Sequence, residues 1–581
     1  MKRKGWILCL VLMMITVAGI WLTATGRQTG EPGEIRVDVV VDNHVITHIE
    51  ILEHNETPEF SKSMVQLADN IVAKNSPDVD VISGATLTSN RFLKAVKQDL
   101  EEKGYSPEDL ATAERENDSS GHMQTECDIL IIGGGGAGFS AAIEAASTSD
   151  SRIIVLEKMS FGGGNTRMSG GEYAAPGNWV QQKEGLFDDS QELYYQDIYE
   201  GGGRKGNPKL IRILAEQALE NALWLRDFVG VEYKDYQSWY GGHSMPRTLW
   251  PVGDGPAYID TLIGKAEELG VDVHYNTRAV ELIRDSAGRV SGVRAVRMGK
   301  TVDYVAHKGV ILTTGGFGAN VDMRMEYDTH WKTLDASIPT TNSPAIVGDG
   351  IVMARDIGAN LVGMEDIQLY PVNNPATGNY YFMDYARINA NALLLNQEGK
   401  RFVDEKETRD NLSAAILTQT DARAYELIDS NVIKSMNLEH LYEGEMEKCI
   451  QQGVLARGSL EDCCEYFKLP IEEVRNTIAE YNEFAAAGND LDFGRTEHLQ
   501  AISQGPYIMF SCIVSVHHTM GGVEIDEYAR VMDTSGEPIK GLYAAGEVTG
   551  GIHGSNRLGS MSIPDTVTFG RIAAKSAAAE R

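Results

Sequence analysis

The chain opens with a continuous apolar segment that follows a basic head. Residues 6–24 are almost all apolar, and they come directly after Lys2, Arg3, Lys4 and a glycine. A basic head before an apolar core of about 20 residues is typical of a secretory signal or of an uncleaved membrane anchor. Residues 1–27 are therefore expected to be a signal peptide or an N-terminal apolar helix. The protein is expected to be exported, either secreted or anchored in the membrane at the cell surface.

The next segment alternates between apolar and polar positions. Residues 35–41 and 45–52 alternate in the way that half-buried strands do, with a short turn between them. Residues 60–74 and 89–102 have the spacing of amphipathic helices. The pattern predicts a small α+β domain over residues 30–110.

Beyond this domain the pattern becomes that of a parallel sheet. Residues 111–124 are polar and lack periodicity, which indicates a linker. Residues 128–132 form the continuous apolar run of a strand that is buried on both faces. An Ala-rich helix over residues 140–146 and a second strand over residues 152–156 follow. This order predicts a βαβ unit at the start of a larger α/β domain.

Glycines occupy the turn between the first strand of that unit and its helix. Gly133, Gly135 and Gly138 have the spacing GxGxxG, and Glu157 ends the second strand. Glycine permits a tight turn and lets a pyrophosphate approach the helix N-terminus, where backbone N–H groups favour anions. An acid about 20 residues further on accepts a hydrogen bond from a ribose hydroxyl. The sequence therefore predicts a dinucleotide site, for which both NAD and FAD are candidates.

Charge and cysteine usage exclude several other classes of protein. Aspartate and glutamate number 83 against 52 lysines and arginines, which gives a formal net charge of −31. Nucleic-acid phosphates repel so acidic a chain, so no nucleic-acid partner is expected. The six cysteines include no CxxC pair. Neither a disulfide framework nor a metal site is therefore expected.

Further glycine-rich and polar strings in the larger domain favour FAD over NAD. They are GGNT at 163–166, SGG at 169–171, TTGGFG at 313–318, AAGE at 544–547 and GIHGSNRLG at 551–559. Together they resemble the soluble fumarate reductase and flavocytochrome c family of FAD enzymes. The resemblance covers about residues 125–581.

That resemblance implies a fold and a set of cofactor residues. It implies a Rossmann-like FAD-binding domain over residues 125–364 and 519–581, with an inserted α+β capping domain over residues 365–518. FAD is expected to be bound non-covalently. The residues assigned to FAD are Gly133, Gly135, Gly138, Glu157, Lys158, Asn165, Thr166, Gly170, Gly171, Thr314, Gly315, Gly316, Asp349, Glu547 and Arg557.

A second flavin motif lies in the small domain. The string DVISGAT over residues 80–86 resembles the threonine-flavinylation motif of the FMN-binding domain family, and that resemblance covers about residues 33–104. It implies that Thr86 carries covalent FMN through a phosphoester, which a separate flavin transferase attaches. Gly84 and Ala85 leave room for a phosphate beside the backbone, and Thr86 supplies the hydroxyl.

The resemblance also places the reacting residues. Arg409 stands at the family's proton-donor position, and His518 and Arg557 stand where the family binds the substrate carboxylate; the neighbouring His517 is expected to be structural. Hydride attack on an activated C=C bond builds negative charge on the carboxylate, which an arginine can hold with two parallel hydrogen bonds. A guanidinium normally stays protonated, so Arg409 needs a proton relay behind it or acts by stabilising charge. The expected substrate-binding residues are Tyr370, Asp384, His518, Thr519 and Arg557.

One position departs from the fumarate reductase pattern. The string QLYP over residues 368–371 replaces the Gln-x-His-Pro of fumarate reductases. Tyr370 in place of histidine removes a possible cation and adds an aromatic face, which disfavours a dicarboxylate and favours an aryl acrylate. Urocanate reductases are similar in carrying tyrosine here, together with a downstream aspartate for which Asp384 is the candidate.

The expected function is a respiratory reductase. A membrane electron donor, either a quinol or a flavin-based system, would reduce the FMN, which passes electrons to FAD and on to an α,β-unsaturated carboxylate such as urocanate. The alternatives are a fumarate reductase that gives succinate, another FAD oxidoreductase such as a 3-ketosteroid dehydrogenase, and a non-enzymatic flavin electron carrier.

Overall fold

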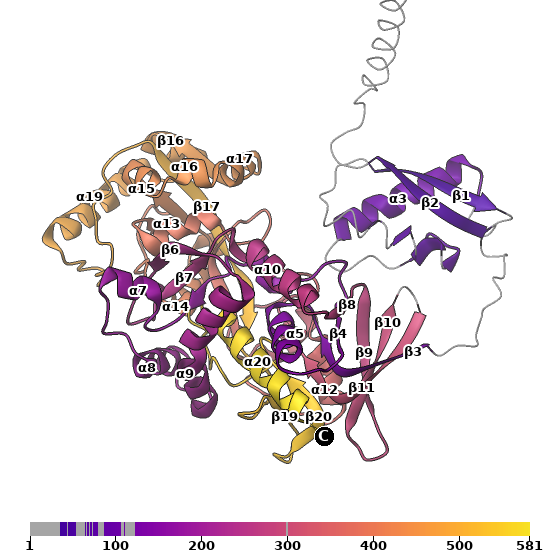
Figure 1. Ribbon diagram of the computed structural model, residues 1–581. Helices are drawn as coiled ribbons and strands as arrows, with labels where there is room; N and C mark the ends of the chain where they lie inside the picture. The colour runs from indigo at the N-terminus through magenta and orange to yellow at the C-terminus, as the bar shows by residue number, and fades with distance from the viewer. Residues whose placement is uncertain are drawn as a thin grey trace, which may run out of the picture. The chain divides into compact units, whose positions relative to one another are not determined.

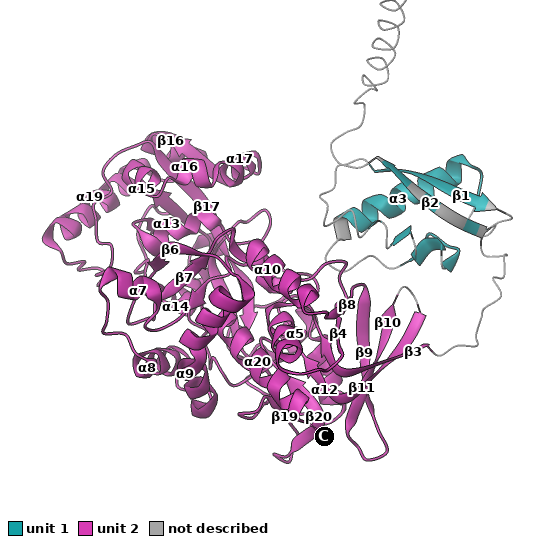
Figure 2. Cartoon of the chain, in the orientation of Figure 1, with its two compact units in different colours: residues 1–117 teal, residues 118–581 magenta. Residues whose placement is uncertain are grey.

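A computed structural model describes the chain from the first strand onwards. The described residues are 35–42, 45–53, 64–79 except 65, 66, 69 and 73, 86–105, 110, 123–297 and 300–580. The chain divides into two compact units, residues 1–117 and 118–581 (Figure 2). The predicted apolar helix of residues 1–27 and most of the predicted linker lie outside the described residues. None of the helices within the described ranges is long and apolar enough to cross a membrane.

The first unit is a small α+β fold. Strands β1 (Arg36–Asp42) and β2 (Val45–Glu53) form an antiparallel pair, and helix α3 (Thr86–Glu102) packs against them. The two strands that the alternating pattern predicted are confirmed. Val39 and Ile49, at apolar positions of that pattern, are buried in one core with apolar residues of α3. Thr86 is the first residue of α3, while residues 80–85 of the flavinylation motif lie outside the described residues.

An eight-stranded sheet forms the centre of the second unit. Its main path, in spatial order, is β19 (Arg530–Met532), β20 (Pro538–Ala544), β11 (Lys300–Leu312), β3 (Met123–Ile132), β4 (Ile153–Leu156) and β8 (Asp272–His274). All neighbours from β20 to β8 run parallel, as the apolar run of the first predicted strand indicated. Strands β9 (Thr277–Arg284) and β10 (Val290–Arg297) add an antiparallel extension beside the first half of β11.

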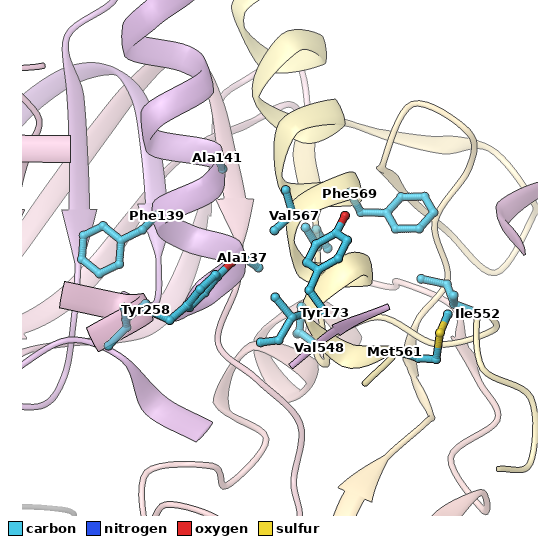
Figure 3. Packing of buried hydrophobic residues seen from close by; sticks show 14 of the residues in the cluster. Ala137, Phe139, Ala141, Tyr173, Tyr258, Val548, Ile552, Met561, Val567 and Phe569 are labelled. Carbon is cyan, nitrogen blue, oxygen red and sulfur yellow. The ribbon is translucent and has the colours of Figure 1, made fainter. Parts of the chain in front are cut away.

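Two helices pack closely at the start and the end of this domain. In Figure 3, Ala137 and Ala141 of α5 (Gly136–Thr148) face Val567 of α20 (Ser562–Ala579), while Phe139 points to the other side of α5. These side chains are all buried. Small residues on α5 let the C-terminal helix approach the glycine turn that begins α5, so residues more than 400 positions apart build one cofactor wall.

The second sheet of this unit belongs to the inserted α+β capping domain. It contains five strands, namely β13 (Ile367–Asn373), β14 (Leu393–Leu395), β15 (Ala424–Ile428), β16 (Leu455–Gly458) and β17 (Tyr507–Thr519). Figure 1 shows this sheet and helices α15 to α19 at the end of the unit away from β9 and β10. Strand β17 pairs antiparallel with β13, and its register sets His518 opposite Gln368. Tyr370 of the QLYP string and His518, both singled out from the sequence, therefore lie on neighbouring strands.

Candidate active site

The glycine turn between β3 and α5 is shaped for a phosphate. Gly133 has a φ of 111°, and a Cβ there would lie 2.4 Å from the carbonyl oxygen of Thr313. A Cβ on Gly138 would lie 2.0 Å from the Gly133 oxygen, so both positions require glycine. Gly135 differs, because a Cβ there would meet only the Gly163 oxygen, at 3.9 Å, and Gly135 lines a cavity. A pyrophosphate fits beside Gly135, where the first-turn N–H groups of α5 have no acceptor within their helix.

Glu157 lies in the same cavity in the place expected for the ribose acceptor. Its two carboxylate oxygens accept one backbone hydrogen bond each, from Gly134 N–H at 2.8 Å and from Met159 N–H at 2.8 Å. Burial raises the pKa of Glu157. Each carboxylate oxygen has a second lone pair, so the side chain can still accept from a ribose hydroxyl.

The cofactor cavity is also lined by an ion pair and by a polar group without a partner among the described residues. Lys158 Nζ lies 2.6 Å from Asp349 Oδ2, and Arg278 lies 2.9 Å from the other oxygen. The Thr314 hydroxyl is buried and forms no hydrogen bond with any described residue. A buried hydroxyl without a partner is rare in folded proteins, and a polar cofactor in the cavity would satisfy it.

Glu547 joins the cofactor wall to the end of β17. It accepts hydrogen bonds from Thr519 N–H at 3.0 Å and Asn165 Nδ2 at 3.1 Å, and its Oε1 lies 3.6 Å from His518 Nδ1. A Cβ on Gly316 would lie 1.9 Å from the Thr519 hydroxyl oxygen, which leaves no room for another residue. This contact fixes the end of β17 against the cofactor cavity.

One continuous cavity brings together most of the residues singled out from the sequence. Those that line it are Gly133, Gly135, Glu157, Lys158, Asn165, Thr166, Gly170, Thr314, Gly315, Asp349, Tyr370, Arg409, His518, Glu547 and Arg557. Gly138, Gly171, Gly316, Asp384 and Thr519 do not line it. The first three of these are backbone positions that shape the wall, and Thr519 acts there through Glu547. Thr86 belongs to the other unit.

Arg557 is a buried cation in this cavity. Its Nη1 donates to the Leu558 oxygen at 3.0 Å, while its Nε is buried without a partner among the described residues. Burial and the nearby Arg409 lower the pKa of Arg557 to about 9, so the guanidinium is still charged at neutral pH. Within the described chain no carboxylate forms an ion pair with Arg557. A buried charge is costly without a partner, and an anionic ligand would supply one.

Arg409 begins α14 (Arg409–Leu417) and faces the same space. Its guanidinium lies 4.9 Å from the centre of the Tyr370 ring, and Nη1 lies 3.5 Å from Gln368 Oε1. Gln368 also donates to the Arg557 oxygen at 2.8 Å and to Asn556 Oδ1 at 2.7 Å. Gln368 therefore holds the two arginine-bearing segments in one arrangement.

Both histidines of HHTMGG line the cavity, although the sequence analysis expected a ligand role only for His518. The His517 ring lies 5.0 Å from the Tyr370 ring, and its Nδ1 is 2.8 Å from the Thr341 hydroxyl. Burial and the cations Arg409 and Arg557 hold the pKa of His517 well below its ordinary value. The ring is therefore neutral and still able to share a hydrogen bond with a carboxylate. His517 stands beside His518 in the sequence, but its contacts with Tyr370 and Thr341, from other segments, are what place its ring on the cavity.

The structure places Asp384 behind Tyr370 rather than on the cavity. The Tyr370 hydroxyl donates to Asp384 Oδ2 at 2.8 Å, and Arg387 holds both Asp384 oxygens at 2.6 and 2.8 Å. Asp384 is fully buried and can influence a ligand only through Tyr370. The expected direct contact between Asp384 and the substrate is therefore replaced by a buried Tyr370–Asp384–Arg387 group.

Sequence reasoning also missed part of the wall beside the arginines. Tyr240, Tyr380, Tyr385 and Glu172 line the cavity there. Tyr380 lies 5.7 Å from Tyr370 and 6.2 Å from His517, measured between ring centres. Only Glu172 adjoins a recognisable string, because it follows SGG directly.

Comparisons with known proteins agree with this geometry. A model of the FAD binding domain matches residues 128–563, and one of the FMN-binding domain matches residues 30–101. A urocanate reductase from Eggerthella lenta is 37% identical over 96% of this chain and 92% of its own length. An NADH:fumarate oxidoreductase from Klebsiella pneumoniae is 36% identical over 94% of this chain, which spans only 57% of that protein. The open conformation of a flavocytochrome c3 fumarate reductase superposes with a TM-score of 0.65 at 33% identity, covering 82% of this chain and 81% of that one.

These matches confirm the resemblance that the motifs indicated, including the two flavin-binding domains. The match to the FAD binding domain, the glycine turn and the hydroxyl without a partner identify FAD as the cofactor of the cavity, and the match to the FMN-binding domain identifies FMN as the second flavin. The chain belongs to the family of FAD-binding oxidoreductases that contains these reductases, with an FMN-binding domain at its N-terminal side.

Proposed function

We propose that this protein is an exported respiratory reductase that saturates the C=C bond of an aryl-substituted acrylate, with urocanate as one candidate. The observation that carries the proposal is Arg557, a buried guanidinium without a carboxylate partner among the described residues. It shares one cavity with Arg409, His517 and the glycine turn of the FAD site. That combination accommodates an anion beside a flavin.

The chain's own residues would bind the substrate carboxylate and supply the proton that the α-carbon receives. Arg557, with His517 and His518 beside it, would hold the carboxylate and stabilise the charge that it gains as the double bond is attacked. Bound FAD would supply the hydride, to the carbon β to the carboxylate. Arg409 would donate a proton to the α-carbon, and solvent would replace it. Asp384, which pairs with Arg387, accepts from the Tyr370 hydroxyl and so holds the ring on which Arg409 packs.

The aromatic wall favours an aryl group over a second carboxylate. Tyr370, Tyr380, Tyr385 and Tyr240 line the cavity beside the arginines. An aromatic ring gains both buried area and edge-to-face contacts in such a site, which a second carboxylate does not. Fumarate is therefore the weaker candidate, although one relative is named an NADH:fumarate oxidoreductase.

The route of the electrons is proposed from the sequence and from the matched FMN-binding domain. Thr86 lies within the match to that domain and would carry FMN after attachment by a flavin transferase. The basic and apolar N-terminus supports export and a membrane donor, a quinol or a flavin-based system. FMN would then be the point at which electrons enter.

The test is turnover by the flavin-loaded protein with reduced viologen as donor and a panel of urocanate, cinnamate, fumarate and acrylate. We expect urocanate or cinnamate to reoxidise the protein fastest. Arg409→Ala should lower kcat by about 100-fold or more, in the range lost when a general acid is removed, while the FAD content stays unchanged. Failure of every enoate to reoxidise the protein would exclude the proposal.

A further inference from the structure

Glu426 is an acid inside the capping domain that the proposed reaction does not use. It lies in the middle of β15, which runs between β17 and β14 in the five-stranded sheet. Side chains alternate between the two faces of a strand, so Glu426 is on the same face as Ala424 and Ile428, which belong to the largest buried core. Its side chain is fully buried. An acid therefore occupies a core position.

The surroundings of Glu426 do not suit an ionised carboxylate. Within the described chain, neither of its oxygens has a hydrogen-bond donor. The Nε of Arg387 lies 3.9 Å from Glu426 Oε2, which is beyond hydrogen-bonding distance. This Nε already donates to Asp384 Oδ1 at 2.6 Å, and the other guanidinium nitrogens donate to Asp384 Oδ2 at 2.8 Å and to the Glu405 oxygen at 2.7 Å. A charge on Glu426 would be buried without a hydrogen bond, which is costly.

A proton on Glu426 removes that cost and supplies a donor. Burial and the negative charge of Asp384 raise the pKa of Glu426 well above its ordinary value, so the carboxyl group is neutral at pH 7. A neutral carboxyl group carries one O–H donor. Asp384 is within hydrogen-bonding reach of Glu426 and provides the acceptor.

The other titratable groups that act on Glu426 do not reverse this state. Arg387 and Lys406 favour the ionised form, but burial outweighs them. The Cys512 thiol on the neighbouring strand β17 is neutral itself, because burial raises its pKa. Glu426 therefore keeps its proton at neutral pH.

The hydrogen bond from Glu426 would complete the set of donors around Asp384. Asp384 also accepts two bonds from Arg387 and one from the Tyr370 hydroxyl, at 2.8 Å. One proton shared by two carboxyl groups beside one guanidinium leaves these three side chains without net charge. Tyr370, on whose ring Arg409 packs at 4.9 Å, is then held by an uncharged group. Such a group does not compete with a substrate anion for the charge of Arg409.

We propose that Glu426 is a positioning residue that binds a proton at neutral pH and donates it in a hydrogen bond to Asp384. Asp384 in turn holds the Tyr370 hydroxyl, and the Tyr370 ring holds Arg409. Glu426 does not line the cavity and acts only through these residues. The inference rests on the proposed function for the purpose of this arrangement, whereas the bound proton can be tested without turnover.

Infrared spectroscopy of the flavin-loaded protein at pH 7 detects the proton directly. The difference spectrum between wild type and Glu426→Gln should contain the C=O stretching band of a protonated carboxylic acid. This band should disappear from the difference spectrum when the pH is raised far enough to ionise Glu426. A difference spectrum at pH 7 that shows only carboxylate bands would overturn the inference.

The value of kcat, measured with reduced viologen and urocanate or cinnamate, tests the positioning role. Glu426→Gln keeps an N–H donor for Asp384 and should retain most of the wild-type kcat at pH 7. Glu426→Leu removes the donor and should lower kcat by about 10-fold or more, as expected when a hydrogen bond to a charged group is lost, with a smaller change in KM. Tyr425→Phe changes the opposite face of the same strand and should match the wild type at every pH.

The pH dependence separates positioning from a purely structural role. Over the pH range in which the infrared band disappears, kcat of the wild type should fall relative to that of Glu426→Gln, whose amide has no proton to lose. Loss of the band without this fall, or equal losses of kcat in Glu426→Gln and Glu426→Leu, would overturn the positioning role. If Glu426→Leu does not retain FAD, the comparison of wild type with Glu426→Gln decides alone. If the band is present but no enoate is reduced, the proposed function fails while the proton on Glu426 stands.

Discussion

At the scale of single residues, the buried His517 makes the stability of the protein depend on pH. The pKa of His517 is held well below its ordinary value by burial and by Arg409 and Arg557. In the unfolded chain the same ring has a pKa of about 6.5 and takes up a proton below that pH. The unfolded state then binds more protons than the folded state, so the free energy of unfolding falls as the pH falls. Because of His517, the free energy of unfolding of the wild-type protein should fall by about 1.4 kcal/mol between pH 7.5 and pH 5.5.

His517→Gln tests this assignment by denaturant unfolding at the two pH values. The variant lacks the titrating ring. The difference in free energy of unfolding between wild type and variant should therefore be smaller at pH 5.5 than at pH 7.5, by about 1.4 kcal/mol. Comparing the two proteins cancels the titration of the other groups, including the buried carboxyls. His440→Gln, a change of an exposed histidine, should leave the difference constant. A difference that widens at low pH would mean that His517 is charged in the folded protein.

At this scale the resemblance pointed to Arg409, His518 and Arg557, each of which stands inside a short string of the sequence. The structure brings all three to one cavity. Sequence reasoning could not place Asp384, because a residue's distance from the ligand depends on which side chain packs in front of it, here Tyr370. It overlooked Glu172 because a single acid after two glycines gains meaning only when Tyr240 and Tyr385 reach it from distant segments.

At the scale of elements, the contact between α5 and α20 controls the cofactor wall. A Cβ on Gly570 of α20 would lie 2.7 Å from the Ala137 oxygen and 3.2 Å from Ser140 Cβ of α5. Gly570→Ala should therefore push the helices apart, lower the free energy of unfolding by about 1–3 kcal/mol and weaken FAD binding. The measurements are denaturant unfolding and the FAD released on dilution.

Gly264→Ala is the matched control for that change. Gly264 lies inside α10 (Asp254–Glu268), and no atom lies within 4 Å of the position of its Cβ. Replacing a helical glycine by alanine without a clash should stabilise the protein by about 0.5–1 kcal/mol. Equal effects of both substitutions would show that helix propensity, and not the close approach of α5 and α20, decides the result at Gly570.

The elements themselves were predictable where the pattern repeats over a whole strand or helix. The alternation of β1 and β2 and the apolar run of β3 are local properties, and both are found as expected. The extension of β9 and β10 beside β11 was not anticipated. Residues 277–297 lie outside the glycine-rich strings from which this domain was predicted, although Asp285 and Gly288 between β9 and β10 are ordinary turn residues. Strand β10 pairs with β9 on one side and with β11 on the other.

At the scale of the whole molecule, the division into two units predicts that the two flavins can be lost separately. The first unit has its own buried core around Val39, Ile49 and Phe92, and the cavity assigned to FAD is lined wholly by residues of the second. Thr86→Ala, expressed in a host with a flavin transferase, should therefore lack the FMN adduct in peptide mass spectrometry yet keep its FAD. Reduced viologen, a small donor, should still support enoate reduction, whereas electron delivery from membranes should fail because the entry flavin is missing. Loss of FAD together with FMN would show that the units depend on each other, and full activity with membranes would show that electrons reach FAD by another route.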